Sequence, residues 1–215
     1  MSVAAKICGI NSNEALDAAL AGGAGYVGLV FFPRSPRNLT PDQAGALAAR
    51  APAETTVVGL LVDPDDATLA EIAAKSRIDL WQLHGRETPD RVTRIKLDTG
   101  KPVMKAISVA GPEDVAVAEA YTGVADRLLF DAKPPPDLKG AMPGGNALAF
   151  DWDLLGGRTW PCPWMLSGGL DADNVTQAVA ISGALAVDVS SGVESAPGVK
   201  DPGQIRAFLK TVAAL

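Results

Sequence analysis

The sequence predicts an α/β fold, a single (β/α)8 TIM barrel with a parallel eight-stranded core that forms one domain over residues 1–215. Eight short apolar runs recur along the chain, and alanine-rich stretches with helix-start residues separate most of them. Strand and helix patterns that alternate in this way favour a parallel sheet. Each of the eight units averages roughly 27 residues, which is the size of the repeat in a minimal barrel.

The eight runs are nearly continuous in valine, leucine, isoleucine and phenylalanine, as is typical of strands that are buried on both faces. They cover residues 3–8, 26–32, 56–62, 79–85, 103–109, 127–132, 164–169 and 184–190. Six of the stretches between or after them begin with residues typical of helix N-termini, such as a capping side chain or glycine followed by proline or an acidic residue. These predicted helices cover residues 13–23, 41–50, 65–75, 112–123, 172–183 and 202–215.

A doubly wound sheet is the alternative fold for such a pattern. That fold usually carries its glycine-rich phosphate signature directly after the first strand. Here the turns rich in glycine and serine follow the seventh and eighth runs, which favours the barrel. One long irregular stretch, residues 133–150, is predicted to be a lid or a binding loop, because loops of this length in compact domains are usually functional.

Composition and charge exclude several classes of partner. The formal net charge is −6 and the chain has no block of lysine or arginine, so we expect no nucleic-acid partner. No apolar run reaches the ~18 residues that a membrane helix needs, so we expect no membrane partner. Two cysteines are too few for a disulfide framework, and the first residues lack the pattern of a secretory signal, so a cytoplasmic location is predicted.

Cys8 and Asp131 are the candidate catalytic residues, because catalytic groups in a barrel project from the C-terminal ends of its strands. Cys8 ends the first run, and strand alternation places Lys6 on the same face, where its charge would favour the thiolate. Asp131 ends the sixth run. Each also has an ordinary interpretation: Cys8 as a small buried hydrophobic residue, and Asp131 as a loop cap or the partner of Lys133. Together they suggest a thiolate base and a carboxylic acid that face one substrate, whereas Cys162 is given no role.

Two late turns are predicted to bind phosphate. Gly168 and Gly169 end the seventh run, Ser190 ends the eighth, and Ser191 and Gly192 follow it. Small residues let backbone N–H groups close on an anion, and barrel phosphate sites commonly lie after strands seven and eight. Glycine is also common in turns that bind nothing. The prediction therefore depends on finding two such turns at these two positions.

Two further side chains are candidates for substrate binding. Arg37 follows the second run, where it is either a solvated loop residue, like Arg34, or a fork that grips a carboxylate with two hydrogen bonds. His84, the only histidine, ends the fourth run and is either structural or in contact with substrate. With one histidine and scattered carboxylates, the sequence gives no credible set of metal ligands, so we predict no metal.

Taken together, these motifs resemble the phosphoribosylanthranilate isomerase family of tryptophan biosynthesis. The resemblance covers nearly the whole chain and depends on the order and combination of the motifs. They are KICGI (6–10), VGLVFFPRSPRNL (27–39), QLHG (82–85), LLFDAK (128–133), PGGNALAFDW (143–152), SGGL (167–170), DNV (173–175) and VDVSSGVE (187–194). The resemblance implies an Amadori rearrangement of a small phosphosugar, N-(5-phosphoribosyl)anthranilate, without a cofactor, by a monomer or weak homodimer.

The resemblance also implies a role for individual residues. Asp131 corresponds to the general acid at the ribose ring oxygen, Cys8 to the base that takes the proton from sugar C2, and Arg37 to the residue that holds the anthranilate carboxylate. The remaining matches are the phosphate-binding Gly168, Gly169, Ser190, Ser191 and Gly192, and the substrate-binding His84, Asp188, Gly144 and Gly145. The chain departs from the family at Ala147, where a glycine is common, and this could affect lid closure.

Three other interpretations remain open on the sequence. A histidine-pathway isomerase runs the same rearrangement but resembles an aspartate pair, so Cys8 argues against it. An epimerase of the related kind needs metal ligands that the sequence does not supply. A non-catalytic phosphate-binding barrel is disfavoured because both Cys8 and Asp131 are present.

Overall fold

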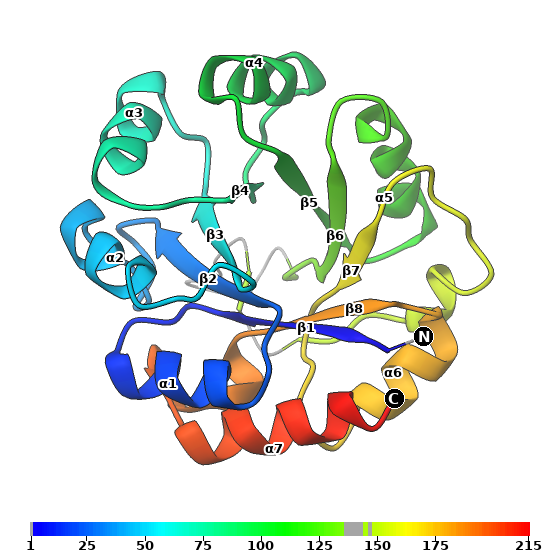
Figure 1. Cartoon of the computed structure of the whole chain (residues 1–215). Helices are drawn as coiled ribbons and strands as arrows, with labels where there is room; N and C mark the ends of the chain where they lie inside the picture. Colours follow the sequence, from blue (N-terminus) through cyan, green and yellow to red (C-terminus); the bar gives the residue numbers. More distant parts are fainter. Residues whose placement is uncertain (1, 136–143, 146–147) are drawn as a thin grey trace.

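A computed structural model describes residues 2–135, 144–145 and 148–215, and its strands form a closed barrel. Each strand pairs in parallel with the next one along the chain, and the last pairs with the first (Figure 1). The strands are β1 (Ala4–Cys8), β2 (Tyr26–Phe31), β3 (Thr56–Leu61), β4 (Leu80–Leu83), β5 (Val103–Val109), β6 (Arg127–Ala132), β7 (Trp164–Leu166) and β8 (Ala186–Val189). The predicted barrel and all eight predicted strands are confirmed.

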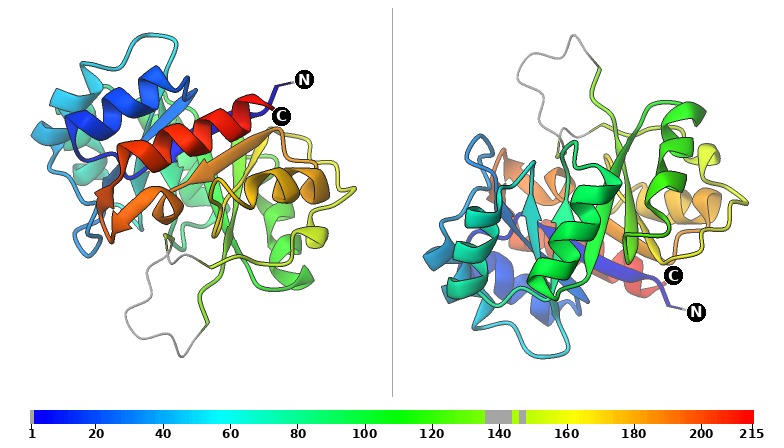
Figure 2. Two further views of the ribbon diagram at one scale, coloured as in Figure 1. Left: turned by 90° about the horizontal axis from the view of Figure 1, so that it is seen from below. Right: turned by 90° about the horizontal axis from the view of Figure 1, so that it is seen from above.

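Helices surround the barrel and lie outside its ring of strands (Figures 1 and 2). The α-helices of the described residues are α1 (Asn13–Ala21), α2 (Pro41–Ala48), α3 (Asp66–Lys75), α4 (Pro89–Thr99), α5 (Pro112–Val117), α6 (Val175–Ser182) and α7 (Pro202–Ala213). Short 3-10 helices are η1 (Ala118–Tyr121), η2 (Trp152–Leu154) and η3 (Ser191–Val193). None of these helices is both long and apolar enough to span a bilayer.

The six predicted helices are present, but α4 was missed by the sequence analysis. Its start has ordinary capping chemistry, since the Thr88 side chain accepts a hydrogen bond from the Arg91 N–H and Pro89 occupies the first turn. Only Val92 and Ile95 of α4 are buried, and charged residues fill most of the rest. A search for alanine-rich, apolar stretches therefore passed over a helix that contacts the barrel through two side chains.

Helix α6 begins at Val175, three residues later than the predicted start at 172. The Asp171 side chain explains this delay, because its Oδ1 accepts hydrogen bonds from the N–H groups of Asp173 and Asn174. A carboxylate that closes a local turn competes with helix formation. The turn extends the connection from β7 and leaves the residues directly after the strand at the barrel mouth.

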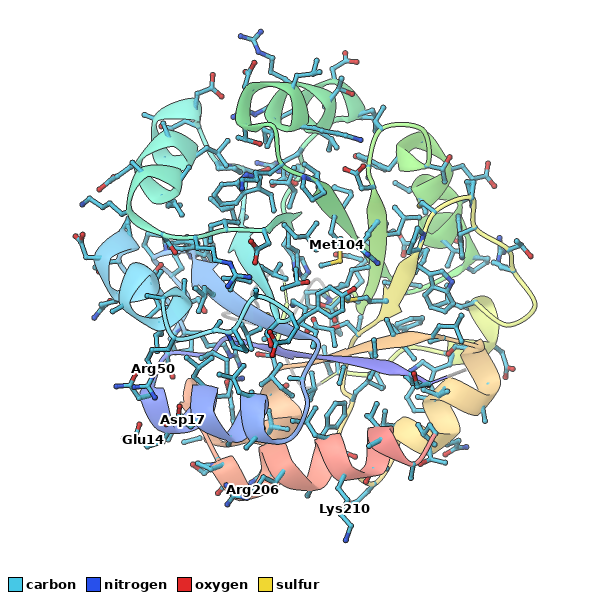
Figure 3. The ribbon with its side chains drawn as sticks, in the orientation of Figure 1. Glu14, Asp17, Arg50, Met104, Arg206 and Lys210 are labelled. Atoms are coloured by element: carbon cyan, nitrogen blue, oxygen red, sulfur yellow. The ribbon has the colours of Figure 1, made fainter. Side chains whose placement is uncertain are left out.

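The core consists of two shells separated by the strands. Successive side chains of a strand point to opposite faces, so every second residue faces the barrel interior. The interior shell contains Val58, Leu80, Met104, Ala106, Leu129, Met165 and Ala186. Met104 lies inside the ring of strands, whereas Glu14, Arg206 and Lys210 on the helices point outward (Figure 3). The same alternation directs the side chains of Cys8 and Asp131 inward at the strand ends.

A small hairpin follows β8 and η3 and precedes α7. Its strands are β9 (Glu194–Ala196) and β10 (Val199–Lys200), which pair in antiparallel fashion with Lys200 opposite Glu194. The Asp201 N–H donates to the Val193 carbonyl and so fixes the base of the hairpin. The hairpin thereby places two charged side chains beside the end of β8.

Candidate active site

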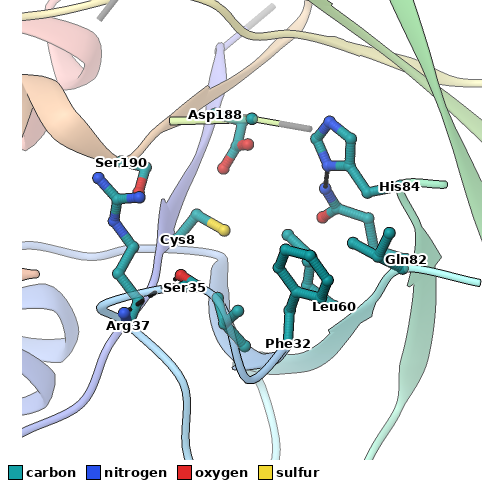
Figure 4. Close-up of a pocket in the computed structure, with 12 residues that line it drawn as sticks. Cys8, Phe32, Ser35, Arg37, Leu60, Gln82, His84, Asp188 and Ser190 are labelled. Carbon is teal, nitrogen blue, oxygen red and sulfur yellow. Dashed lines mark hydrogen bonds between the residues drawn. The ribbon is translucent and has the colours of Figure 1, made fainter. Parts of the chain in front are cut away.

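A pocket lies at the end of the barrel where the strands terminate. It holds about 440 Å³ of empty space, part of it open to solvent, and is lined by Cys8, Val30, Phe32, Ser35, Arg37, Leu60, Val62, Gln82, His84, Gly144, Asp188 and Ser190. Cys8, Arg37 and Ser190 lie on one side of it, and Gln82 and His84 on the other (Figure 4). The apolar lining and the few convergent polar groups are typical of a small-molecule site.

A second pocket of about 310 Å³ adjoins the first and shares Asp188 and Ser190 with it. It is lined by Asp131, Ala132, Gly145, Leu148, Ser167, Gly168, Gly169, Leu170, Asp188, Ser190 and Ser191. Four of the five predicted phosphate-binding residues are in this lining, and Gly192 is not. The barrel mouth therefore has two connected compartments, one that contains Cys8 and Arg37 and one that contains Asp131 and the two late turns.

Cys8 and Asp131 both face this mouth, from β1 and β6, and each is only 4% exposed. Gly28 on the neighbouring strand β2 makes room for the cysteine, since a Cβ at that position would lie 2.9 Å from Cys8 Sγ. Asp131 Oδ1 accepts a hydrogen bond from the Ala132 N–H at 3.0 Å, and its Oδ2 lies 3.2 Å from His84 Nε2. The sequence thus correctly placed both side chains at one end of the barrel.

His84 lies between Asp131 and the buried amide of Gln82. Gln82 Nε2 lies 3.1 Å from His84 Nδ1, and both side chains are buried on the inward face of the strand end. His84 Nε2 faces Asp131 Oδ2 but, like Gln82 Oε1, makes no hydrogen bond among the described residues. The predicted contact residue His84 therefore lies beside Asp131, and Gln82 orients His84.

Lys6 lies beside Cys8 on the inner face of β1 and is fully buried. Its Nζ donates to Asp188 Oδ1 at 2.9 Å, and the Ser167 hydroxyl lies 3.2 Å from Asp188 Oδ2. Burial by itself would lower the pKa of Lys6, but the charges of Asp188 and Cys8 outweigh this effect and raise it. Lys6 is therefore a permanent cation next to the cysteine, neutralised in part by Asp188.

The pKa of Cys8 is raised, which corrects the expectation that Lys6 would shift it downward. Burial is the largest cause, because it disfavours the charged thiolate; Lys6 lowers the pKa, while the Asp188 carboxylate raises it again. Lys6 is already paired with the Asp188 carboxylate, so its charge stabilises a Cys8 thiolate only in part. In the protein without substrate, Cys8 is thus a neutral thiol at neutral pH.

This pKa shift predicts a pH dependence. Only the thiolate is nucleophilic, so the rate at which iodoacetamide alkylates Cys8 should rise with pH and continue to rise above the ordinary cysteine pKa of about 8.5. The measurement is the alkylation rate from pH 6 to 10 in the Cys162→Ala variant, which keeps Cys8 as its one cysteine, with circular dichroism at each pH to verify the fold. A rate that levels off below pH 8 would contradict the raised pKa.

Arg37 is buried, and one edge of its guanidinium is occupied. Its Nε lies 2.7 Å from Glu194 Oε1 and its Nη2 lies 2.8 Å from Glu194 Oε2, so the two form a fork. The outer edge consists of Nη1 and the second proton of Nη2. Nη2 also donates to the Gly145 carbonyl at 3.4 Å, so Nη1 is the guanidinium donor that the described residues leave for a carboxylate in the pocket. A Cβ at Gly145, which has φ +73°, would lie 2.5 Å from Nη1, so glycine is required for the chain to approach this edge.

Gly144 brings the long β6–β7 connection close to Asp131 and His84. A Cβ at this position would lie 2.8 Å from Asp131 Oδ2 and 2.9 Å from His84 Cε1. The described part of the predicted binding loop thus reaches the mouth. Ala147, the departure from the family pattern, lies outside the described residues.

The two late turns have the predicted small residues, together with a cation that the sequence analysis missed. Gly168 has φ +91°, and a Cβ there would lie 2.7 Å from the Ala132 backbone nitrogen. Lys200 Nζ donates to the Ser190 carbonyl at 2.8 Å and lies 3.2 Å from the Ser190 hydroxyl. Over residues 2–135, 144–145 and 148–215, no cluster of three or more His, Cys, Asp or Glu side chains is arranged to hold a metal ion.

The closed barrel and its mouth define a class: a (β/α)8-barrel protein with a small-molecule site where a thiol, a carboxyl group and two regions suited to anions converge. Residues 5–211 match the family model described as N-(5'phosphoribosyl)anthranilate (PRA) isomerase. The chain belongs to this family of isomerases.

Curated relatives and solved structures agree with this family. The N-(5'-phosphoribosyl)anthranilate isomerase of Paramagnetospirillum magneticum is 62% identical over 211 residues, which cover 98% of this chain and 97% of that protein. The isomerase of Rhodospirillum centenum is 56% identical over the full length of both. A crystal structure of the Thermotoga maritima isomerase superposes with a TM-score of 0.88 at 33% identity and covers 99% of this chain and 100% of that one.

Proposed function

We propose that this protein converts N-(5'-phosphoribosyl)anthranilate into 1-(2-carboxyphenylamino)-1-deoxyribulose 5-phosphate, an Amadori rearrangement in tryptophan biosynthesis that needs no cofactor. The observation that carries the proposal is the position of Cys8 and Asp131 in two connected compartments that end at Arg37 and at the two late turns. A further solved relative, 31% identical with a TM-score of 0.83, is described as an isomerase in complex with reduced 1-(o-carboxyphenylamino)-1-deoxyribulose 5-phosphate. Such a ligand has a phosphate at one end and a carboxylate at the other.

The first chemical step is ring opening, with Asp131 as the general acid. The anthranilate nitrogen donates its electron pair to form a C=N bond at C1, the bond from C1 to the ring oxygen breaks, and Asp131 gives its proton to that oxygen. The product is a protonated Schiff base. The position of Asp131 at the end of β6 supports this role: Oδ1 accepts a hydrogen bond from the Ala132 N–H, and Oδ2 lies 3.2 Å from His84 Nε2 at the mouth.

The second step is removal of the proton from C2, with Cys8 as the base. The electron pair of the C2–H bond moves to form a C1=C2 bond and neutralises the Schiff base, which gives an enolamine. The enolamine then takes a proton at C1 and loses one from the 2-hydroxyl group to become the ketose. The positive charge of the Schiff base and of Lys6 both favour the thiolate at the moment it is needed, which offsets the cost of burying Cys8.

Binding at the two ends orients the reacting carbons. The phosphate is placed at Gly168, Gly169, Ser190 and Ser191, and the anthranilate carboxylate at the outer edge of Arg37. Asp188, as the partner of Lys6, and the glycine pair of the β6–β7 connection enclose the sugar. Holding a substrate at both ends makes the proton transfers effectively intramolecular.

Arg37→Ala is expected to raise KM by about 10- to 100-fold, with a smaller effect on kcat, because hydrogen bonds to a charged group contribute about 1.5–3 kcal/mol each. Steady-state kinetics on the purified variant measures this change. The matched control is Arg34→Ala, since Arg34 belongs to the same loop but is exposed. An unchanged KM in the Arg37 variant would exclude this arginine as the carboxylate contact.

The proposed function is tested by mixing the protein with freshly made N-(5'-phosphoribosyl)anthranilate and following the loss of its fluorescence. Rapid turnover, lost in a Cys8 variant, is the expected result. Turnover of a histidine-pathway aminoaldose alone would indicate the other isomerase. Phosphate binding without any turnover would indicate a non-catalytic barrel.

Three broader features stay predictions. They are a cytoplasmic location, a single domain over residues 1–215, and a monomer or weak homodimer. A solved Thermotoga maritima relative is described as mutually generated monomers of a dimeric isomerase, so both states occur among the relatives.

A further inference from the structure

The β9–β10 hairpin places two buried charges behind the substrate pocket. Glu194 opens β9 and Lys200 closes β10, and their side chains are 3% and 0% exposed. Lys200 Nζ lies 2.8 Å from Glu194 Oε1. Removing these two charges from water costs free energy. A buried pair of this kind therefore needs further hydrogen-bond partners to compensate.

Glu194 has four donors around its carboxylate. Arg37 contributes Nε and Nη2 at 2.7 and 2.8 Å, Lys200 contributes Nζ, and the Gly198 N–H lies 3.2 Å from Oε2. Burial alone would raise the pKa of Glu194, but the hydrogen bond from Arg37 and the charge of Lys200 outweigh it and lower the pKa. Glu194 is therefore ionised and holds Arg37 by both atoms of one guanidinium edge.

Lys200 extends this arrangement to the phosphate side. Its Nζ donates to the Ser190 carbonyl at 2.8 Å and lies 3.2 Å from the Ser190 hydroxyl. Lys200 therefore holds Ser190 through both its backbone carbonyl and its side chain. One continuous chain of contacts thus joins Arg37, Glu194, Lys200 and Ser190.

We propose that Glu194 and Lys200 are positioning residues that fix the carboxylate-binding edge of Arg37 and the phosphate-binding turn at Ser190 in one orientation relative to each other. The proposal rests on the function given above. Glu194 holds the guanidinium in the pocket lining, with its outer edge beside Gly145, and Lys200 links Glu194 to the end of β8. The protein thereby selects substrates whose carboxylate and phosphate are a fixed distance apart.

The charges of this chain support the same conclusion. Burial lowers the pKa of Lys200, while the charge of Glu194 acts in the opposite direction and favours the ammonium. With Lys200 charged, Arg37, Lys200 and Glu194 together are positive by one in a protein with a net charge of −6. A local positive excess attracts an anionic substrate to this side of the mouth. Glu194 lowers this positive charge, so it does not help to attract the substrate. Its role is instead to hold Arg37 in position.

The test compares Glu194→Asp, which keeps the charge but shortens the side chain, with Glu194→Gln, which keeps the length but removes the charge. The probes are the reduced product analogue made from anthranilate and the corresponding analogue made from aniline, which lacks the ring carboxylate. Calorimetry gives both affinities for each variant. The matched control is Asp126→Asn, because Asp126 forms an ion pair with Lys96 and accepts from the Val103 N–H at the opposite end of the barrel.

If Glu194 acts by position, Glu194→Asp should bind the carboxylate-bearing analogue about tenfold more weakly, equivalent to 1.4 kcal/mol, and the aniline analogue within twofold of wild type. Glu194→Gln, which still reaches Arg37, should lose less. The proposal would be overturned if Glu194→Asp lost no affinity, or lost equal affinity for both analogues. It would also be overturned if Glu194→Gln lost more affinity for the carboxylate-bearing analogue than Glu194→Asp. Circular dichroism shows whether each variant folds. If one does not, the ratio of affinities for the two analogues, measured on the other variant and compared with wild type, still tests the proposal.

Lys200 is tested through the phosphate end. Lys200→Met should weaken competitive inhibition by inorganic phosphate about tenfold, as expected when the turn at Ser190 loses the charged hydrogen bonds that hold it in place. Lys200→Arg keeps the charge with a different reach and serves if the methionine variant does not fold. Unchanged phosphate inhibition would remove Lys200 from the proposal. Wild-type protein that fails to turn over N-(5'-phosphoribosyl)anthranilate would instead contradict the proposed function, so the two failures are distinguishable.

Discussion

Replacing Cys8 by alanine is expected to lower kcat by about 10²- to 10⁴-fold, the usual contribution of a positioned acid or base. The side chain is inward on β1, 4% exposed, and lies in the pocket lining beside Lys6. Removal of the sulfur atom leaves the C2 proton without a base but leaves the binding groups in place. The defect should therefore fall on kcat, while KM changes little. Steady-state kinetics with the fluorescent substrate measures both constants.

Two further variants separate the chemistry of Cys8 from its packing. Cys8→Ser keeps the shape, but its hydroxyl is a far poorer source of an anion, so its loss should approach that of Cys8→Ala. Cys162→Ala is the matched control, because Cys162 is also a free cysteine but lines a separate pocket with Arg158 and Trp160. Near-normal kcat in Cys8→Ser would show that Cys8 only packs.

Asp131→Asn should lower kcat by about 10²- to 10⁴-fold as well. The amide has nearly the same shape as the carboxyl group and can still accept the hydrogen bond from the Ala132 N–H. It has no acidic proton to give to the ribose ring oxygen, so ring opening loses its acid. Each tenfold loss corresponds to about 1.4 kcal/mol in the activation barrier. Kinetics and the temperature of thermal unfolding, measured on the same sample, distinguish lost chemistry from lost stability.

The control for Asp131 is Asp126→Asn, the same chemical change just before the same strand. Asp126 pairs with Lys96 at the opposite end of the barrel, so its loss should affect stability and leave kcat near the wild-type value. A catalytic defect of equal size in both variants would mean that Asp131 acts through the fold. A wild-type rate in Asp131→Asn would exclude it as the general acid.

Much of the fold could be predicted because each buried strand has a local signature. The run from Val103 to Val109 is almost continuously apolar, since both of its faces are covered, and it forms β5 with the predicted bounds. Helix α7 begins at Pro202 after the cap Asp201, as its sequence indicated. Helix α4 begins with the same threonine and proline as α2, but it was missed because its apolar face is narrow and buries only Val92 and Ile95.

Part of the site was also accessible from the sequence. Strand ends identify Cys8, His84 and Asp131, and alternation along a strand fixes the face on which each lies. Glu194 and Lys200 escaped detection because they come from a short hairpin outside the barrel, and their partners Arg37 and Ser190 belong to other loops. Contacts between residues far apart in sequence leave no periodic signal in a single chain.

The sequence by itself determined the order of strands, the inward direction of the catalytic side chains and the position of the small-residue turns. These properties depend on neighbours within a few residues, whose backbone preferences and apolar pattern can be read directly. The tertiary structure decided the ionisation of Cys8 and the orientation of Arg37. The pKa of the thiol depends on burial and on two opposite charges, Lys6 and Asp188, and the guanidinium is held by a carboxylate 157 residues away. Electrostatic energies vary with distance in space and with exclusion of water, and only the folded chain sets both.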